Sequence, residues 1–311
     1  MLKIAYHPIY KHPLPEGHRF PMLKYELIPE QLIYEGTVES AHFFTPVLQS
    51  DINRYILGVH DERYVKALQD VAIDPKMERK IGFPVTEKLI EREWLITQGT
   101  ILCCQYALQY GISMNIAGGT HHAYPDRGEG FCLLNDVAVG AEFLLQNQLS
   151  KQILVIDLDV HQGNGTAVIF QNRPEVFTFS MHGKDNYPLK KEISDLDITL
   201  PTGTEDEAYL RLLDLHLSSL LDTVNPDFLF FISGVDVLST DKLGKLGMTM
   251  EGCQERDRRV IQAASERNIP LVISMGGGYS PQIATIIEAH CQTFRLAADY
   301  SEWGFQKFKN K

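Results

Sequence analysis

The stretch that decides the fold is residues 153–165, which read ILVIDLDVHQGNG. The first four residues are apolar and mostly β-branched, which predicts a strand buried on both faces of a sheet. Acidic residues, a histidine and glycines follow at once, which predicts that this strand ends in a polar loop. Ligands bind beyond the carboxyl ends of strands in open parallel sheets, so this loop is a candidate functional site.

Similar apolar runs recur along the chain and alternate with amphipathic segments. The candidate strands are residues 3–6, 114–117, 153–156, 176–180, 228–232 and 271–274. The candidate helices are residues 89–110, 136–146, 205–224 and 254–266. Strands that alternate with helices predict βαβ units and a mostly parallel sheet. No repeat, linker or composition break interrupts the chain, and so we expect one α/β domain over residues 1–311, with an irregular segment near residues 8–21.

Composition narrows the classes of function. An apolar fraction of 44% and a charged fraction of 22% argue against intrinsic disorder. The net charge of −11 argues against direct nucleic-acid binding and is more compatible with a cationic substrate. The first residues lack the apolar core of a signal peptide, no apolar run suits a membrane helix, and the five cysteines form no CxxC pair. We therefore expect a cytoplasmic protein without a membrane partner.

Polar groups follow five of the predicted strands. In chain order they are His121 and His122; Asp157, Asp159 and His161; Ser180 and His182; Asp236; and Tyr279. The carboxyl ends of parallel strands meet at one edge of a sheet, so these groups are expected to lie close together. One such group could arise by chance, but five at one edge favour a functional site.

The densest cluster, residues 157–161, has two interpretations. Its acids could cap a helix, or the segment could bind a metal ion. Alternate residues of an extended segment face the same side, so Asp159 and His161 can reach one ion, and Asp236 can supply a third ligand. Two carboxylates and one imidazole suit a catalytic Zn²⁺, although Fe²⁺ accepts similar ligands. We favour the metal site and leave the metal open between these two.

The histidine pair and the tyrosine suggest proton transfer. His121 and His122 could each be structural, but their succession at a strand end favours one as general base and the other as holder of a proton. Asp157 could orient one of the imidazoles. Residues 276–279, GGGY, lack the lysine and the spacing of phosphate-binding loops, so we expect the Tyr279 hydroxyl to donate to an oxyanion. The absence of GxSxG and HExxH argues against acyl-enzyme chemistry and a helix-borne zinc protease.

Four segments together resemble the histone deacetylase superfamily. They are residues 118–136, 155–166, 232–249 and 274–280, and the likeness runs from about Ile4 to about His290. Residues 161–165 and 203–206 look most like the class IV branch, and residues 13–22 resemble bacterial members. The resemblance implies a three-layer arginase/deacetylase fold, with a mostly parallel central sheet of about eight strands. It also implies a zinc-dependent amidohydrolase that removes acyl groups from lysine side chains.

The resemblance also implies roles for residues of the site. The expected zinc ligands are Asp159, His161 and Asp236, and the expected catalytic residues are His121, His122 and Tyr279. His122 would be the principal general base, and Tyr279 would polarise the scissile carbonyl. The expected supporting and tunnel residues are Asp157 as partner of His121, Asp157 and Ser180 in a structural K⁺ or Na⁺ site, Gly130 and Phe131 in one tunnel wall, and Tyr187 in the opposite wall.

Two departures from the family pattern bear on mechanism and substrate. Asn164 stands where many relatives have an aspartate paired with the second histidine, and a neutral partner would stabilise imidazolium less. Residues 80–87 offer no equivalent of the rim aspartate that binds the substrate backbone in many relatives. Peptide recognition is therefore expected to be looser, or the substrate is not a protein.

Several functions are compatible with this scaffold. The leading hypothesis is hydrolysis of acetyl-lysine or longer acyl-lysine, and the alternative enzymatic substrate is an acetylpolyamine. An acyl-lysine-binding module without chemistry is a further alternative, although the intact set of expected ligands, histidines and Tyr279 argues against it. A two-metal, arginase-like hydrolase would need additional aspartate ligands that the sequence does not show.

Overall fold

The computed structural model describes residues 1–305. Its strands are β1 (Lys3–Ala5), β2 (Phe43–Phe44), β3 (Ile112–Asn115), β4 (Ile153–Asp157), β5 (Val176–Gly183), β6 (Leu196–Leu200), β7 (Phe228–Ser233) and β8 (Leu271–Met275). They form one eight-stranded sheet in the order β2-β1-β3-β8-β7-β4-β5-β6. Every neighbouring pair is parallel, which confirms the predicted α/β class. Residues 306–311 of the predicted domain lie outside the described residues.

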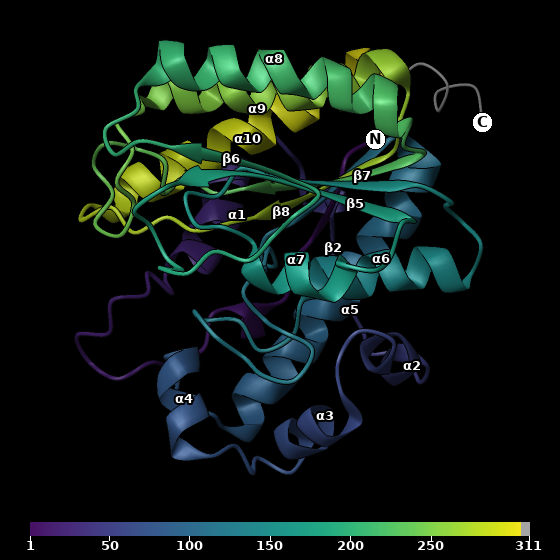
Figure 1. The fold of residues 1–311 in the computed structure, drawn as a ribbon, viewed down its shortest axis with the longest axis vertical. Helices are drawn as coiled ribbons and strands as arrows, with labels where there is room; N and C mark the ends of the chain where they lie inside the picture. Colours follow the sequence, from purple (N-terminus) through teal and green to yellow (C-terminus); the bar gives the residue numbers. More distant parts are fainter. Residues whose placement is uncertain (306–311) are drawn as a thin grey trace.

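Helices cover both faces of the sheet (Figure 1). One face carries α8 (Asp206–Val224), α9 (Met250–Arg267) and α10 (Ile283–Trp303), and α1 (Lys24–Tyr34) packs against α10. The other face carries α5 (Glu87–Tyr110), α6 (Asp136–Gln146) and α7 (Asn164–Phe170). Beyond this layer lie α2 (Ile52–Leu57), α3 (Glu62–Gln69) and α4 (Pro75–Ile81), and two 3₁₀ turns span Pro8–Tyr10 and Ser40–His42. No helix in the described part of the chain is long and apolar enough to cross a membrane.

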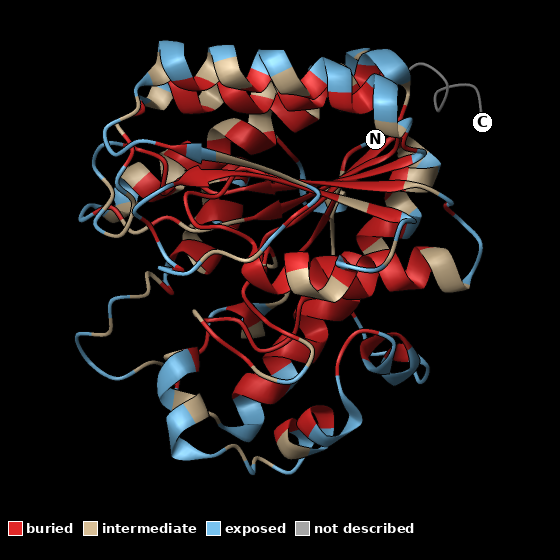
Figure 2. Ribbon diagram, viewed as in Figure 1, coloured by how far each residue is buried: buried red, intermediate tan, exposed pale blue. Residues whose placement is uncertain are grey.

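The core follows from the apolar strands. All six residues of β7 and all five of β4 are buried, as expected for strands that helices cover on both faces. Figure 2 shows the central strands of the sheet as buried, whereas α8 alternates between buried and exposed residues. Burial of each large apolar side chain contributes about 1.5–3 kcal/mol, so the central strands form a firm platform. The loops at their carboxyl ends are built on that platform.

Local signals fix the helix ends beside this edge. At the start of α4, Asp74 Oδ1 accepts hydrogen bonds from the backbone amides of Lys76 and Met77, at 2.9 and 3.1 Å. Gly82 ends the same helix with a φ of 84°, a left-handed conformation that favours glycine. Asn135 caps α6 by accepting from the Ala138 amide at 3.0 Å. These caps fix the end of α4 and the start of α6, and the Gly130–Phe131 loop lies between these two helix ends.

The six predicted strands correspond to β1, β3, β4, β5, β7 and β8, and the four predicted helices to α5, α6, α8 and α9. The strand predicted at residues 114–117 begins two residues earlier, at Ile112. Sequence reasoning missed β2, which has only two residues, and β6, whose residues are mostly half-buried or exposed. It also missed α1, α2, α3, α4, α7 and α10.

Candidate metal centre and active site

The three predicted metal ligands come together at the carboxyl edge of the sheet. Asp159 and His161 lie in the loop between β4 and α7, and Asp236 lies just after β7, the neighbour of β4. All three are buried, and one ligand atom from each lies within 4.8 Å of the others. His161 Nδ1 is 3.0 Å from Asp159 Oδ1 and 3.1 Å from Asp236 Oδ2. The adjacency of two parallel strands thus joins ligands that are far apart in sequence.

The chemistry of this trio fits a divalent cation. Asp236 Oδ2 is buried and has no well-oriented hydrogen-bond donor among the described residues. The opposite oxygens are held by backbone amides, from Val160 to Asp236 Oδ1 at 2.9 Å and from Gly277 to Asp159 Oδ2 at 2.6 Å. Burial and the neighbouring Asp159 raise the pKa of Asp236 to about 7. Two fixed carboxylates that crowd each other in a buried site are stabilised by a bound cation.

Two glycines allow the close packing around these groups. A Cβ on Gly277 would overlap the Asp236 carboxylate, so a larger residue there would push the ligand aside. Gly130 has a φ of 55°, and a Cβ on it would lie 2.6 Å from the His122 ring. The site therefore needs glycine at both positions for steric reasons.

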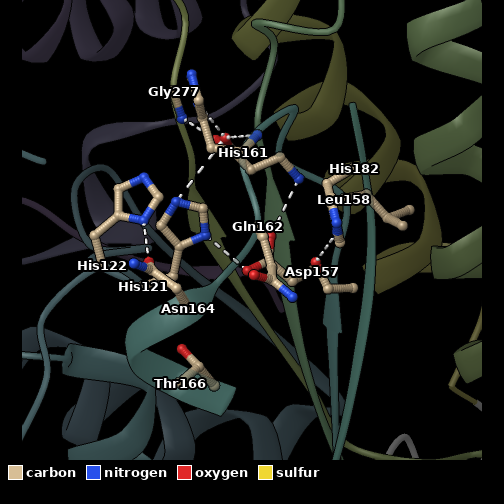
Figure 3. A network of polar contacts seen from close by, with 12 residues as sticks. His121, His122, Asp157, Leu158, His161, Gln162, Asn164, Thr166, His182 and Gly277 are labelled. Carbon is tan, nitrogen blue, oxygen red and sulfur yellow. Dashed lines mark hydrogen bonds and ion pairs between the residues drawn. The ribbon is translucent and has the colours of Figure 1, made fainter. Parts of the chain in front are cut away.

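The tandem histidines follow β3 and lie side by side, with ring centroids 4.1 Å apart (Figure 3). His121 Nδ1 donates to Asp157 Oδ2 at 2.7 Å, and His122 Nδ1 donates to Asn164 Oδ1 at 2.6 Å. We assign the proton to Nδ1 because both partner oxygens are acceptors. A neutral His122 then keeps a lone pair on Nε2, which is the form that a general base requires.

The two imidazoles differ in charge. Burial lowers the pKa of His121, but the carboxylates of Asp157 and Asp159 outweigh it and raise that pKa to about 9. Burial, His121 and His161 together hold the pKa of His122 well below its usual value of 6.5. Near pH 7, His121 is therefore charged and His122 is neutral. One histidine is ready to accept a proton beside another that already holds one.

The hydrogen bonds continue beyond Asn164. Its Nδ2 donates to the Tyr124 hydroxyl at 2.9 Å, and that hydroxyl donates to Glu192 Oε1 at 3.1 Å. The chain of donors orients the Asn164 amide so that its oxygen faces His122. Sequence reasoning missed Tyr124 and Glu192, because only the fold brings residue 192 beside residue 124.

Tyr279 follows β8 and faces the same site, with its ring centroid 6.5 Å from that of His161. Its backbone amide donates to Asp241 Oδ2 at 2.5 Å, and Asp241 Oδ1 accepts from the amides of Leu243 and Gly244, both at 2.8 Å. Burial and the nearby Asp236 raise the pKa of Tyr279, so its phenol stays protonated at neutral pH. Asp241 was also missed, although an aspartate three residues before a glycine is a turn signal.

Another missed residue, Asp136, holds the turn before the histidines. Its Oδ1 accepts from the amide and the hydroxyl of Thr120, at 2.9 and 2.7 Å, and its Oδ2 accepts from the Thr100 hydroxyl at 2.7 Å. Asp136 is fully buried and opens α6. It therefore fixes the backbone from which His121 projects.

Residues 18–294 match the model of the histone deacetylase domain. The chain belongs to the histone deacetylase family. It is 43% identical over 296 residues to an uncharacterized protein of Picosynechococcus sp., with 95% of this chain and 98% of that protein covered. It is 30% identical to histone deacetylase 2 of Arabidopsis thaliana, with 87% and 72% covered. The crystal structure of the HDA15 HD domain has the same fold, with a TM-score of 0.78, 18% identity, and 96% and 88% covered.

Membership in the histone deacetylase family assigns the chain to the hydrolases, with a deacetylase type of function. The buried group of Asp159, His161 and Asp236 is a possible metal site in such an enzyme.

An outer cavity of about 1210 Å³, including space open to solvent, leads to the site. His122, His161 and Tyr279 line it from within, and the predicted tunnel residues Gly130, Phe131 and Tyr187 all line it as well. The Tyr187 ring centroid lies 5.0 Å from that of His122.

The Phe131 ring is held by other aromatic rings, with its centroid 5.1 Å from that of Phe20 and 5.0 Å from that of Phe83. Phe20 belongs to the irregular N-terminal segment, which thus folds over the tunnel wall.

The predicted monovalent-cation residues, Asp157 and Ser180, are directly opposite each other on β4 and β5. Ser180 Oγ lies 2.9 Å from His182 Nδ1, and Asp157 Oδ1 accepts from the Asp159 amide at 3.2 Å. Asp157 therefore contacts both His121 and the loop of predicted ligands. The bound K⁺ or Na⁺ stays a prediction.

Proposed function

We propose that this chain is a zinc-dependent amidohydrolase that removes acetyl or longer acyl groups from lysine side chains. The observation that carries the proposal is the buried trio of Asp159, His161 and Asp236 beside the adjacent rings of His121 and His122. The family and this donor set both support zinc. When bound, zinc supplies Lewis-acid polarisation of the amide carbonyl and lowers the pKa of a water molecule.

The chain's own residues then divide the proton transfers. His122, neutral and with a free Nε2, takes a proton as water attacks the amide carbon. Tyr279, protonated at neutral pH, donates to the oxyanion that forms. The leaving amine accepts a proton from a histidine of the pair, which releases a carboxylate and a free amine. His121, held charged by Asp157, stabilises the negative charge that develops as water attacks.

The shape of the outer cavity supports a linear acyl-amine substrate. The rings of Phe131 and Tyr187 line this cavity beside His122, and such rings suit the apolar methylene chain of an acyl-lysine. The resemblance to the class IV branch is the reason to test long acyl chains beside acetyl.

The test measures acyl release by mass spectrometry. Peptides with acetyl-, decanoyl- or myristoyl-lysine and acetylated polyamines are offered to protein reconstituted with Zn²⁺ or Fe²⁺. We compare wild type with Asp159→Ala and with Asp299→Ala, an exposed control on α10. We expect wild type and the control to release acyl groups from peptides, and Asp159→Ala to lose at least about 10³-fold in rate.

Three other outcomes would change the proposal. Turnover of polyamines alone would make the protein a small-molecule amidohydrolase. No turnover of any compound by metal-loaded protein would favour the acyl-lysine-binding module. Activity that Asp159→Ala retains would contradict the proposed metal site.

A further inference from the structure

The mouth of the outer cavity carries positive charge on a protein whose net charge is −11. Arg19, Lys80 and Lys245 line this cavity. Lys242 lines an adjoining hollow that shares Arg19, Leu243 and Tyr279 with it. All four cationic residues are exposed. Cationic side chains thus outnumber Glu129 and Asp185, the carboxylates that line the outer cavity.

The carboxylates at the mouth of the cavity already accept hydrogen bonds from other groups of the protein. Glu129 accepts hydrogen bonds from Arg127 Nε at 2.8 Å and from the Tyr187 hydroxyl at 2.5 Å, and it pairs with Lys80 at 3.3 Å. Asp241, as described above, accepts from three backbone amides. Asp185 accepts from the Thr202 hydroxyl at 2.8 Å.

Three of the cations remain available to a substrate. Among the described residues, Arg19, Lys242 and Lys245 form no ion pair with a carboxylate. The guanidinium of Arg19 lies over the Phe131 ring, 5.1 Å from its centroid, and Lys245 Nζ donates only to the Asp185 backbone carbonyl, at 2.9 Å. None of these three cations is thus paired directly with a carboxylate, whereas Lys80 is paired with Glu129.

We propose that Arg19, Lys242 and Lys245 select acylated amines that carry a carboxylate or phosphate close to the acylated chain, and disfavour polyamines and lysine-rich peptides. A cleft lined by charges of one sign concentrates ligands of the opposite sign and repels the rest. This replaces the expectation of a cationic substrate, which rested on net charge alone. The inference rests on the proposed function, because it concerns which substrates enter the same site.

The test uses substrates that differ only in charge. Three acetyl-lysine peptides have glutamate, alanine or arginine on both sides of the acetyl-lysine. The small-molecule pair is 6-acetamidohexanoate and N-acetyl-1,6-hexanediamine, an anion and a cation of similar length. We measure kcat/KM for each at low salt and at 1 M salt, and the affinity of labelled peptides by fluorescence anisotropy.

For wild type we expect kcat/KM to be about five- to twentyfold higher for the glutamate peptide than for the arginine peptide, because exposed charge pairs each contribute a few-fold. The anionic small molecule should be preferred likewise if free metabolites are substrates. The preference should shrink at 1 M salt, where the Debye length is about 3 Å.

The variants are Arg19→Glu/Lys245→Glu and, because Arg19 also contacts Phe131, Lys245→Glu alone. The matched control is Arg211→Glu/Lys151→Glu, which changes net charge equally at exposed residues outside both hollows. The mouth variants should lose or reverse the preference, and the control should keep it.

The alanine peptide separates this inference from the proposed function. If wild type hydrolyses it but treats the charged peptides alike, or if the mouth variants keep the wild-type preference, the inference is wrong and the proposed function stands. If no peptide is hydrolysed, the proposed function fails. Anisotropy then decides the inference, since equal affinity for the glutamate and arginine peptides would overturn it and tighter glutamate binding that the mouth variants lose would support it.

Discussion

The tandem histidines differ at the residue scale in the side chain that each one contacts. His121 donates to a carboxylate, whereas His122 donates to the amide of Asn164. The carboxylate favours the charged imidazole, and the amide leaves burial to favour the neutral one. Asn164 thus adds no negative charge beside the second histidine, which stays neutral and able to accept a proton.

Asn164→Asp should shift the pH dependence of hydrolysis. An anion 2.6 Å from His122 Nδ1 stabilises imidazolium and raises the pKa of His122. Because the base is inactive when protonated, the acid limb of the kcat/KM profile should move to higher pH. Initial rates between pH 4.5 and 9 measure this shift, with Tyr124→Phe as a control that adds no charge. An unmoved acid limb would mean that His122 is not the titrating base.

Tyr279→Phe should remove the donor to the oxyanion and leave the metal trio intact. We expect kcat to fall by about 10²–10³-fold, with bound zinc unchanged by atomic emission spectrometry. Phe20→Leu, which alters a ring near Tyr279 without removing a donor, is the control. Full turnover by zinc-loaded Tyr279→Phe would rule out the proposed role of its hydroxyl.

Sequence reasoning predicted the residues that local patterns expose. Asp159 and His161 share a side because of the two-residue period of an extended chain, and Asp236 follows an apolar run. Asp136 and Asp241 were missed because their acceptor oxygens reach Thr120 and Tyr279, which lie 16 and 38 residues away. Only the folded chain brings these residues together, so the spacing of residues in the sequence does not reveal such contacts.

At the scale of elements, the site is held by hydrogen bonds between the loops that follow β4, β7 and β8. The Gly277 amide after β8 donates to Asp159 after β4, and Asp241 after β7 accepts from Tyr279 after β8. Strands with a continuous apolar run, such as β4 and β7, were predictable from sequence because both of their faces are covered by helices. β6 was not, because its sequence LDITL is too polar and too exposed to be distinguished from a loop.

Asp241→Asn should weaken one of these contacts between loops, the hydrogen bond from the Tyr279 amide. The asparagine Oδ1 can still accept from Leu243 and Gly244, but its Nδ2 cannot accept from the Tyr279 amide. We expect kcat to fall about tenfold with little change in KM, since misplacement affects the transition state more than substrate binding. The matched control is Asp214→Asn, which changes an exposed residue of α8. A rise in KM alone would instead indicate a role in binding.

At the scale of the whole molecule, the predicted metal site joins the loops that follow β4 and β7, which are neighbouring strands in the interior of the sheet. Without a cation, Asp159 and Asp236 repel each other inside the protein, and this repulsion contributes to the raised pKa of Asp236. A metal that binds only the folded chain stabilises it by about 2.7 kcal/mol at a concentration 100 times the dissociation constant. Occupancy of the predicted metal site would therefore raise the global stability of the protein.

Zinc should accordingly raise the Tm of chelator-treated wild type by several degrees, and Asp236→Asn should abolish this response. The asparagine removes one buried charge and keeps an acceptor for the Val160 amide, so the metal-free variant should melt no lower than metal-free wild type. Differential scanning calorimetry with and without zinc measures both effects, and Asp299→Ala serves as the control that keeps the response. An equal zinc-induced rise in Asp236→Asn would place the ion elsewhere. A large loss of stability in the metal-free variant would mean that the charge of Asp236 supports the fold without any metal.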